Sequence, residues 1–325
     1  MKVAVVEGDG IGKEVVSAAL KVLDALSLDI EEVPVEIGYG KWKRTGKAIT
    51  EDDFDIFESC DCIFFGAITT PPDPDYKSVL VRIRQKFDLY ANIRPIKGMG
   101  VGENIDFTIV RENTEGMYSG VEQVFPDAVH STRVITRRGS ERIAEYACSL
   151  ARGKRLTIVH KANILKSCRL FRDVCIGVAD RHKILWEDML VDAVAHRLVL
   201  DPERFELIVT TNLFGDILSD MAAALIGGLG LCASANIGED YALFEPVHGS
   251  APDIAGKGLA NPVAAILSLA MMLKWFGRVE ESDAVHDAVS RVLAGGITTP
   301  DLGGRYSTAE VAEAVAAAIE KEQAT

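Results

Sequence analysis

Two aspartates, Asp216 and Asp220, stand four residues apart in a segment whose apolar spacing predicts a helix from Ile217 to Leu225. Both carboxylates then share one helical face, where they repel each other by roughly a few tenths of a kcal/mol when exposed, and more when buried. A divalent cation with oxygen ligands would relieve that repulsion. An acidic helix N-terminus explains Asp216 but not Asp220 one turn later. The pair alone leaves both interpretations open.

Three arginines, Arg84, Arg94 and Arg111, fall at the ends of predicted elements. The guanidinium group is a rigid fork that binds carboxylates through two hydrogen bonds, so three of them suit a di- or tricarboxylate. Lys161 follows a predicted strand, and a lysine there can act as a base if burial or a nearby cation lowers its pKa. Tyr118 lies seven residues beyond Arg111. Taken alone, each of these residues fits an ordinary surface position better than a role in a site.

The stretch from Leu243 to Gly256 is rich in small residues and predicts a long loop, followed by a helix that Asn261 can cap. Small residues let a flat ligand approach the backbone closely. Asp253 in this loop could accept both ribose hydroxyls of an adenosine and would repel a 2′-phosphate. His248 fits a ligand contact or a structural histidine.

The sequence also indicates which strands and helices position these residues, because short apolar runs alternate with segments that have the apolar spacing of a helix. Such runs are typical of strands buried on both faces, so the pattern predicts an α/β fold whose sheet is covered by helices. The predicted strands are 3–6, 62–65, 107–110, 156–159 and 207–209, and the clearest helices are 13–26 and 308–321. The glycines of 8–12 lie one residue too close together for the dinucleotide-binding fingerprint, which argues against a Rossmann fold.

Composition narrows the class of protein. A chain of 325 residues can form two domains or one large α/β unit. The net charge of −13 argues against a nucleic-acid partner. No apolar run reaches the roughly 18 residues of a membrane span, and no signal peptide is visible. The six cysteines lack zinc-site spacing and fit reduced thiols in a cytoplasmic protein.

Five blocks of the sequence closely resemble the β-decarboxylating dehydrogenases of the isopropylmalate, isocitrate and homoisocitrate group. The blocks are 88–95 (DLYANIRP), 111–118 (RENTEGMY), 161–163 (KAN), 212–220 (NLFGDILSD) and 244–256 (FEPVHGSAPDIAG). The resemblance implies a two-domain α/β fold with central mixed sheets and a cleft between the domains. One domain would comprise 1–89 and 227–325, and the other 90–226. It also implies a homodimer whose active sites are shared between subunits, with dimer against tetramer left open.

The implied activity is oxidation of a 2-hydroxy acid followed by loss of the β-carboxylate as carbon dioxide. By the same resemblance, Arg84, Arg94 and Arg111 would bind the substrate carboxylates. The expected ligands of Mg²⁺ or Mn²⁺ are Asp216, Asp220 and, from the other subunit, Asp192. The expected catalytic residues are Tyr118, Lys161 and Asp192, with Lys161 as the base and Tyr118 as the proton donor.

The cofactor implied is NAD, because Asp253 and Ile254 stand where relatives using the phosphorylated cofactor carry a lysine and an aromatic residue. The expected cofactor-binding residues are Ile11, Thr70, Glu245, His248, Gly249, Ser250, Ala251, Pro252, Asp253, Ile254 and Asn261.

The substrate is read from the residues before Arg84. Isocitrate enzymes have Ser-x-Asn here, and this chain keeps Ser78 but has Leu80 in place of the Asn. Leu80 and Val81 predict an apolar seat for an isopropyl group, which favours 3-isopropylmalate, the substrate of a step in leucine biosynthesis. Ser78 and the nearby cation Arg82 favour isocitrate or homoisocitrate instead. A non-catalytic regulatory homologue is the alternative of another class, and a phosphatase is weaker because no phosphate loop accompanies the aspartates.

Overall fold

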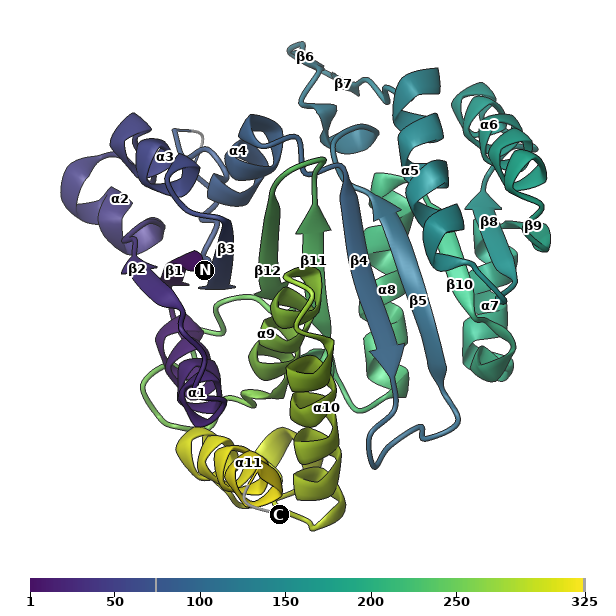
Figure 1. The fold of residues 1–325 in the computed structure, drawn as a ribbon. Coiled ribbons are helices and arrows are strands. Elements are labelled where there is room, and N and C mark those ends of the chain that lie inside the picture. The colour runs from purple at the N-terminus through teal and green to yellow at the C-terminus, as the bar shows by residue number, and fades with distance from the viewer. Residues whose placement is uncertain (74, 324–325) are drawn as a thin grey trace.

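A single ten-stranded mixed sheet runs through the protein in the computed structural model, which describes residues 1–73 and 75–323 (Figure 1). The strand order is β2-β1-β3-β12-β11-β4-β5-β10-β8-β9, and β6 and β7 form a separate hairpin. The strands are β1 (Lys2–Gly8), β2 (Glu31–Pro34), β3 (Cys62–Ala67), β4 (Ala91–Lys97), β5 (Asp106–Glu112), β6 (Glu122–Val124), β7 (Val129–Ser131), β8 (Leu156–His160), β9 (Trp186–Leu190), β10 (Leu207–Thr210), β11 (Ala233–Ile237) and β12 (Ala242–Pro246).

Helices cover both faces of this sheet, with α9 and α5 on one face and α8 on the other (Figure 1). The helices are α1 (Gly12–Ala25), α2 (Tyr39–Thr45), α3 (Glu51–Glu58), α4 (Val79–Lys86), α5 (Arg137–Leu150), α6 (Lys166–His182), α7 (Val191–Leu200), α8 (Asn212–Leu225), α9 (Val263–Trp275), α10 (Val279–Ala294) and α11 (Thr308–Gln323). No helix of the described residues is long and apolar enough to cross a membrane.

The sheet lies at the centre of the protein because its strands are apolar and buried. Every residue of β3, β8 and β10 is buried, as expected for strands with helices on both sides. Along β1 the side chains alternate between two cores: Val3 and Val5 join the larger one, while Ala4 and Val6 join a smaller one. This smaller core also contains residues of α3 and α4, so it anchors the helices that flank the site described below.

The middle of the sheet joins segments that are far apart in the sequence. Strand β11 pairs antiparallel with β4, and β4 pairs antiparallel with β5. All strands on the β11 side come from residues 1–89 and 227–325, and all those on the β4 side come from residues 90–226. The two sets of residues therefore meet between β11 and β4.

The predicted α/β class, with a mixed sheet rather than a Rossmann unit, is confirmed. All five predicted strands are present, and α1 and α11 lie where the helical period placed them. Two details were wrong. Helix α8 already begins at Asn212 rather than Ile217, and the predicted loop from Leu243 begins instead inside strand β12. Leu243 and Phe244 are fully buried, so they extend the sheet despite their small neighbours.

Candidate active site

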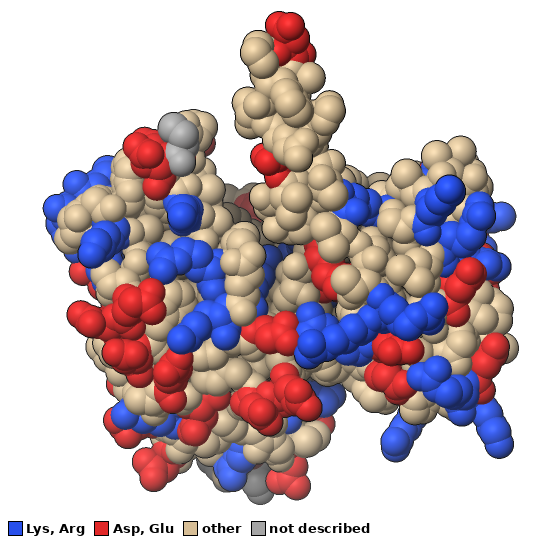
Figure 2. Space-filling view, turned by 90° about the horizontal axis from the view of Figure 1, so that it is seen from above, with Lys and Arg blue, Asp and Glu red and all other residues tan. Residues whose placement is uncertain are grey.

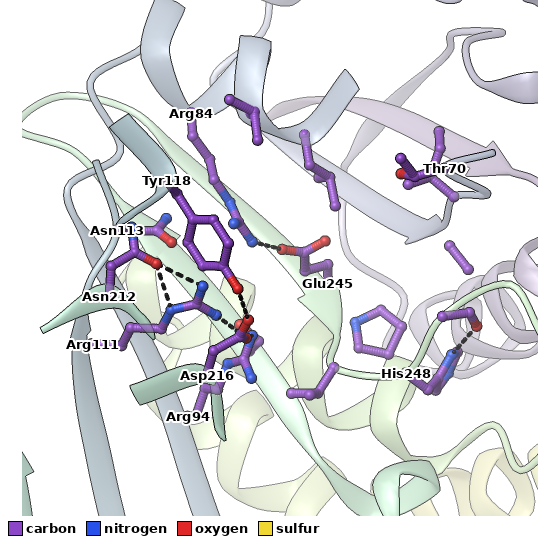
Figure 3. Close-up of a pocket in the computed structure, with 18 of the residues that line it drawn as sticks. Thr70, Arg84, Arg94, Arg111, Asn113, Tyr118, Asn212, Asp216, Glu245 and His248 are labelled. Carbon is purple, nitrogen blue, oxygen red and sulfur yellow. Dashed lines mark hydrogen bonds and ion pairs between the residues drawn. The ribbon is translucent and has the colours of Figure 1, made fainter. Parts of the chain in front are cut away.

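A cavity of about 310 Å³ opens between α4, β12 and the N-terminal end of α8 (Figure 3). One wall of the cavity is charged. Side chains alternate between the two faces of a strand, and Arg94 on β4 and Arg111 on β5 point to the face that α8 covers. Ten of the residues predicted from the sequence line it: Thr70, Leu80, Arg84, Arg94, Arg111, Tyr118, Asp216, Glu245, His248 and Gly249. The structure thus brings together the three predicted arginines, one predicted metal ligand and the predicted proton donor.

Two of the arginines are held rigidly by buried amides. The Nε of Arg94 donates to the side-chain oxygen of Asn92 at 2.7 Å. Both Nε and one terminal nitrogen of Arg111 donate to the side-chain oxygen of Asn212, at 3.1 and 2.7 Å. Arg94 is 6% exposed and Arg111 is 2% exposed. Their guanidinium groups are therefore fixed in place before any ligand binds.

The third arginine is held by a carboxylate. Arg84 donates to Oε1 of Glu245 at 3.0 Å, and the same oxygen accepts from the amide of Asn236 at 2.8 Å (Figure 3). Glu245 is buried and orients an arginine, and its expected contact with the cofactor stays a prediction. The buried Nε of Arg84 has no partner among the described residues, so this arginine keeps a free donor.

Positive charge exceeds negative charge in the wall of the cavity. Burial, together with the neighbouring Arg94 and Arg84, lowers the pKa of Arg111 to about 9, which leaves it charged at neutral pH. Burial also lowers the pKa of Arg94. Burial is the main cause of both shifts. The lining carries three arginines against two carboxylates, Asp216 and Glu245, so an anion with several carboxylates would be attracted here.

Asp216 and Asp220 face the arginines from α8. Oδ1 of Asp216 accepts from Arg111 and lies 3.5 Å from Arg94, and Asp220 accepts from Arg94 at 3.2 Å. Burial, and then repulsion from Asp216, raise the pKa of Asp220, although Arg94 opposes the shift. Tyr118 donates its hydroxyl to Oδ2 of Asp216 at 2.9 Å, and burial raises its pKa. The phenol is therefore protonated at neutral pH.

This aspartate pair fits a hard divalent cation in part. Both side chains remain partly exposed, at 32% for Asp216 and 55% for Asp220, and they offer carboxylate oxygens to the solvent side. Within residues 1–73 and 75–323 no cluster of three His, Cys, Asp or Glu side chains could hold a metal ion. One chain thus supplies two carboxylates, and further ligands must come from substrate, water or another subunit.

Two predicted catalytic residues, Lys161 and Asp192, are not among the residues that line the cavity of the described chain. They pair with each other, with Nζ of Lys161 2.5 Å from Oδ1 of Asp192. Asp192 is 62% exposed. Asp192 therefore lies on the surface, whereas Lys161, at 29% exposure, is partly buried.

Helix α4 presents different side chains to the cavity and to the body of the protein. Leu80 and Val81 line the cavity. Ser78 caps the helix by accepting from the Val81 amide at 3.5 Å, and it is not a lining residue. Arg82 points away, because it donates to the Ile49 carbonyl at 3.1 Å and lies over the Phe54 ring.

The predicted cofactor-binding loop borders the cavity but lies mostly outside it. Of the expected cofactor-binding residues, Thr70, Glu245, His248 and Gly249 line the cavity. The other seven are absent from its described lining: Ile11, Ser250, Ala251, Pro252, Asp253, Ile254 and Asn261. The loop is nevertheless docked beside the glycine turn, because the Ile11 amide donates to the Ser250 carbonyl at 2.9 Å. A Cβ at Gly10 would lie 1.9 Å from that same carbonyl, so only glycine fits.

Several groups in this loop fit a bound cofactor. The Nε2 of His248 is buried without a partner among the described residues, and burial lowers its pKa. Asp253 is exposed, and within the described chain its carboxylate makes no hydrogen bond or ion pair. Asn261 is used structurally, since its oxygen accepts from the Val263 amide and its nitrogen donates to Asp301.

Sequence reasoning missed the residues that hold the arginines in place. Asn92, Asn212 and Ser219 donate to or accept from the arginine network, and Asn236 joins Asn92 to Glu245. For Asn92 a signal existed, because it stands two residues before Arg94 and so shares its strand face. Asn236 carried no local signal, since it reaches the site from another strand.

The comparisons with known proteins agree with this geometry. Residues 2–315 match the family described as isocitrate/isopropylmalate dehydrogenase. The chain is 47% identical to the homoisocitrate dehydrogenase of Methanocaldococcus jannaschii (99% of this chain, 98% of that one), and 48% identical to its 3-isopropylmalate/3-methylmalate dehydrogenase (99% of each). The crystal structure of isocitrate dehydrogenase from Methylococcus capsulatus superposes with a TM-score of 0.95 at 43% identity, over 98% of this chain and 99% of that one.

These relatives cover both chains almost completely, and their names include four different substrates. What they share is the reaction type, which the resemblance predicted and which excludes a regulatory or phosphatase class. The chain belongs to the isocitrate/isopropylmalate dehydrogenase family and is a decarboxylating dehydrogenase.

Proposed function

We propose that this enzyme oxidises and decarboxylates 3-isopropylmalate to 2-oxoisocaproate, with NAD as the hydride acceptor and Mg²⁺ or Mn²⁺ as the metal, in leucine biosynthesis. The observation that carries the substrate assignment is the pair Leu80 and Val81 in the wall of the cavity, close in sequence to Arg84. An apolar wall favours an isopropyl group, whereas a carboxylate placed there would lose its water without gaining a partner.

Ser78 and Arg82, which favoured a substrate with an additional carboxylate, both have other partners in the structure. Arg82 is directed to the Ile49 carbonyl and the Phe54 ring, and Ser78 caps its own helix. The second candidate is homoisocitrate or isocitrate, because relatives of similar identity carry those names. Those substrates need a donor for their extra carboxylate, and the free Nε of Arg84 is the donor that could serve.

Each residue of the site has a separate role in the proposed reaction. Arg84, Arg94 and Arg111 bind and orient the carboxylates. Lys161 of the partner subunit accepts the proton of the substrate hydroxyl as C2 is oxidised. Loss of the β-carboxylate as carbon dioxide leaves an enolate, and Tyr118 donates the proton to C3. The raised pKa of Tyr118 keeps that proton available at neutral pH.

The metal would be held by Asp216, Asp220 and the partner subunit's Asp192. When bound, such a cation lowers the pKa of a hydroxyl group and polarises a carbonyl. We place the adenosine of NAD beside Asp253, whose exposed carboxylate is free to accept the ribose hydroxyls. The unpartnered Nε2 of His248 offers a further contact to the cofactor.

A homodimer explains why Lys161 and Asp192 lie outside the cavity of their own chain. Large apolar side chains are exposed close in sequence to both sets of residues: Ile164, three residues after Lys161, is 71% exposed, and Ile217, next to Asp216, is 59% exposed. The β6–β7 hairpin projects as a narrow, mostly uncharged arm (Figure 2), and Val124 at its tip is 79% exposed. Exposed apolar surface of this kind is typical of contacts between subunits.

We further propose that residues 1–89 with 227–325 form one domain and residues 90–226 the other, because the sheet changes from one set to the other between β11 and β4. The six cysteines are all buried and free, which fits the reducing environment of a cytoplasmic enzyme.

The test is the stoichiometry of the reaction. Incubation with 3-isopropylmalate, NAD⁺ and Mg²⁺ should release NADH, carbon dioxide and 2-oxoisocaproate in equal amounts, and EDTA should stop all three together. Formation of NADH without carbon dioxide would contradict the proposed reaction.

A further inference from the structure

A second cavity lies on the opposite face of the same three strands that form the active site. Side chains of a strand alternate between its faces. On β4, Arg94 faces the first cavity while Ile93 and Lys97 line the second. On β11, Ser234 faces the first cavity and Ala233 the second. The two cavities are therefore back to back, with β11, β4 and β5 between them.

The second cavity has an apolar floor and a cationic rim. Its volume is about 440 Å³, larger than that of the active-site cavity. Buried aliphatic residues form the floor: Ile93, Leu207, Leu231, Ala233 and Leu267. The rim carries the lysines Lys97, Lys154 and Lys274. A space of this kind suits a ligand with an apolar body and a negative end.

The polar groups of this cavity lack partners in the described chain. Ser282, 1% exposed, lines the cavity, and its hydroxyl makes no hydrogen bond. Lys154 and Lys274 have no carboxylate within ion-pair distance among residues 1–73 and 75–323. Of the three rim lysines, Lys97 alone has a carboxylate within ion-pair distance in the described chain, because Asp106, which also lines the cavity, lies 4.0 Å away. Burial and the nearby Lys97 and Lys274 lower the pKa of His286, so this lining residue is a neutral donor or acceptor.

A buried hydroxyl without a partner costs stability unless a ligand or water forms a hydrogen bond with it. An exposed pair of lysines above an apolar pocket attracts an anion, and the floor then buries an aliphatic chain. We propose that this back cavity is a second ligand site that binds a monocarboxylate with a short aliphatic chain. Such a ligand would lie against the backs of the strands that carry Arg94 and Arg111.

Calorimetric titration of the full-length protein with hexanoate tests the site. Hexanoate should bind, each methylene added between butanoate and octanoate should tighten binding by about fourfold, and added NaCl should weaken it. 1-Hexanol, which lacks the charge, should bind at least fivefold more weakly. No binding of hexanoate, or equal binding of hexanol, would overturn the proposal.

Variants separate this site from the arginines of the active site. The double substitution Lys154→Gln and Lys274→Gln should weaken hexanoate binding at least fivefold, whereas Lys43→Gln with Lys183→Gln removes the same charge elsewhere on the surface and should leave binding unchanged. Leu150→Trp, at a rim position that is 39% exposed, should block the cavity.

Arg111→Lys should retain hexanoate binding, because that residue faces the first cavity. Loss of binding in Arg111→Lys with full binding in the lysine double variant and in Leu150→Trp would place hexanoate in the active site and overturn the proposal. Thermal melting of each variant shows whether it is folded. If Leu150→Trp is unstable, the double substitution of Lys154 and Lys274 still tests the site, because both lysines are exposed and their replacement should not affect folding.

Discussion

Replacing Leu80 with asparagine should change the choice of substrate. Leu80 is half-buried in the wall of the cavity, where we expect it to contact the isopropyl group. Loss of that contact should cost about 1–3 kcal/mol of transition-state binding, or about 10- to 200-fold in kcat/KM for 3-isopropylmalate. The amide also offers a hydrogen bond to a carboxylate, so kcat/KM for isocitrate should rise.

The assay is the initial rate of NADH formation with each acid, for the native enzyme and for Leu80→Asn. Arg82→Gln is the matched control from the same helix. Arg82 donates to the Ile49 carbonyl and packs on Phe54, so its loss should leave the ratio of the two kcat/KM values unchanged. The reasoning is refuted if Leu80→Asn keeps the native ratio, or if Arg82→Gln alters it as strongly.

Three further predictions follow from the site. Tyr118→Phe should lower kcat by about 100-fold or more with little change in KM, since it removes a proton donor and not a carboxylate ligand; an equal rise in KM would argue for a binding role. Mixed dimers of Lys161→Ala and Tyr118→Phe, each nearly inactive alone, should recover partial activity when refolded together, because one cleft then has both native residues; dimers that stay inactive although folded would place both residues in one chain's cleft. The native enzyme should prefer NAD⁺ over the phosphorylated cofactor at least tenfold in kcat/KM, about 1.4 kcal/mol, and Asp253→Lys with Ile254→Tyr should reduce that preference; equal use of both cofactors by the native enzyme would contradict the role of Asp253.

Much of the site was predictable because its signals are local. Arg111 lies at the end of a strand whose apolar pattern is plain, and Asp216 lies near the start of a helix that follows a buried strand. Strand β4, which carries Arg94, was not among the predicted strands. Strand alternation and helix periodicity then decide which way each side chain points. The helices and strands themselves were predictable for the same reason.

Contacts between distant segments were not predictable from local pattern. Glu245 holds Arg84 across 161 residues of sequence, and this pairing depends on β12 lying beside β3 in the sheet. The order of strands in a mixed sheet with crossovers has no signature in any single segment. The same holds for the position of Lys161 outside the cavity of its own chain, which depends on where β8 lies in the sheet.

The steady-state kcat/KM of the native enzyme, measured with NAD⁺ and Mg²⁺ for 3-isopropylmalate, homoisocitrate and isocitrate side by side, tests the central claim most directly. With Leu80 and Val81 in the wall and Arg82 turned away, 3-isopropylmalate should exceed both other acids by at least tenfold. A higher kcat/KM for homoisocitrate or isocitrate would contradict the substrate assignment and would show that an arginine of this site reads the extra carboxylate.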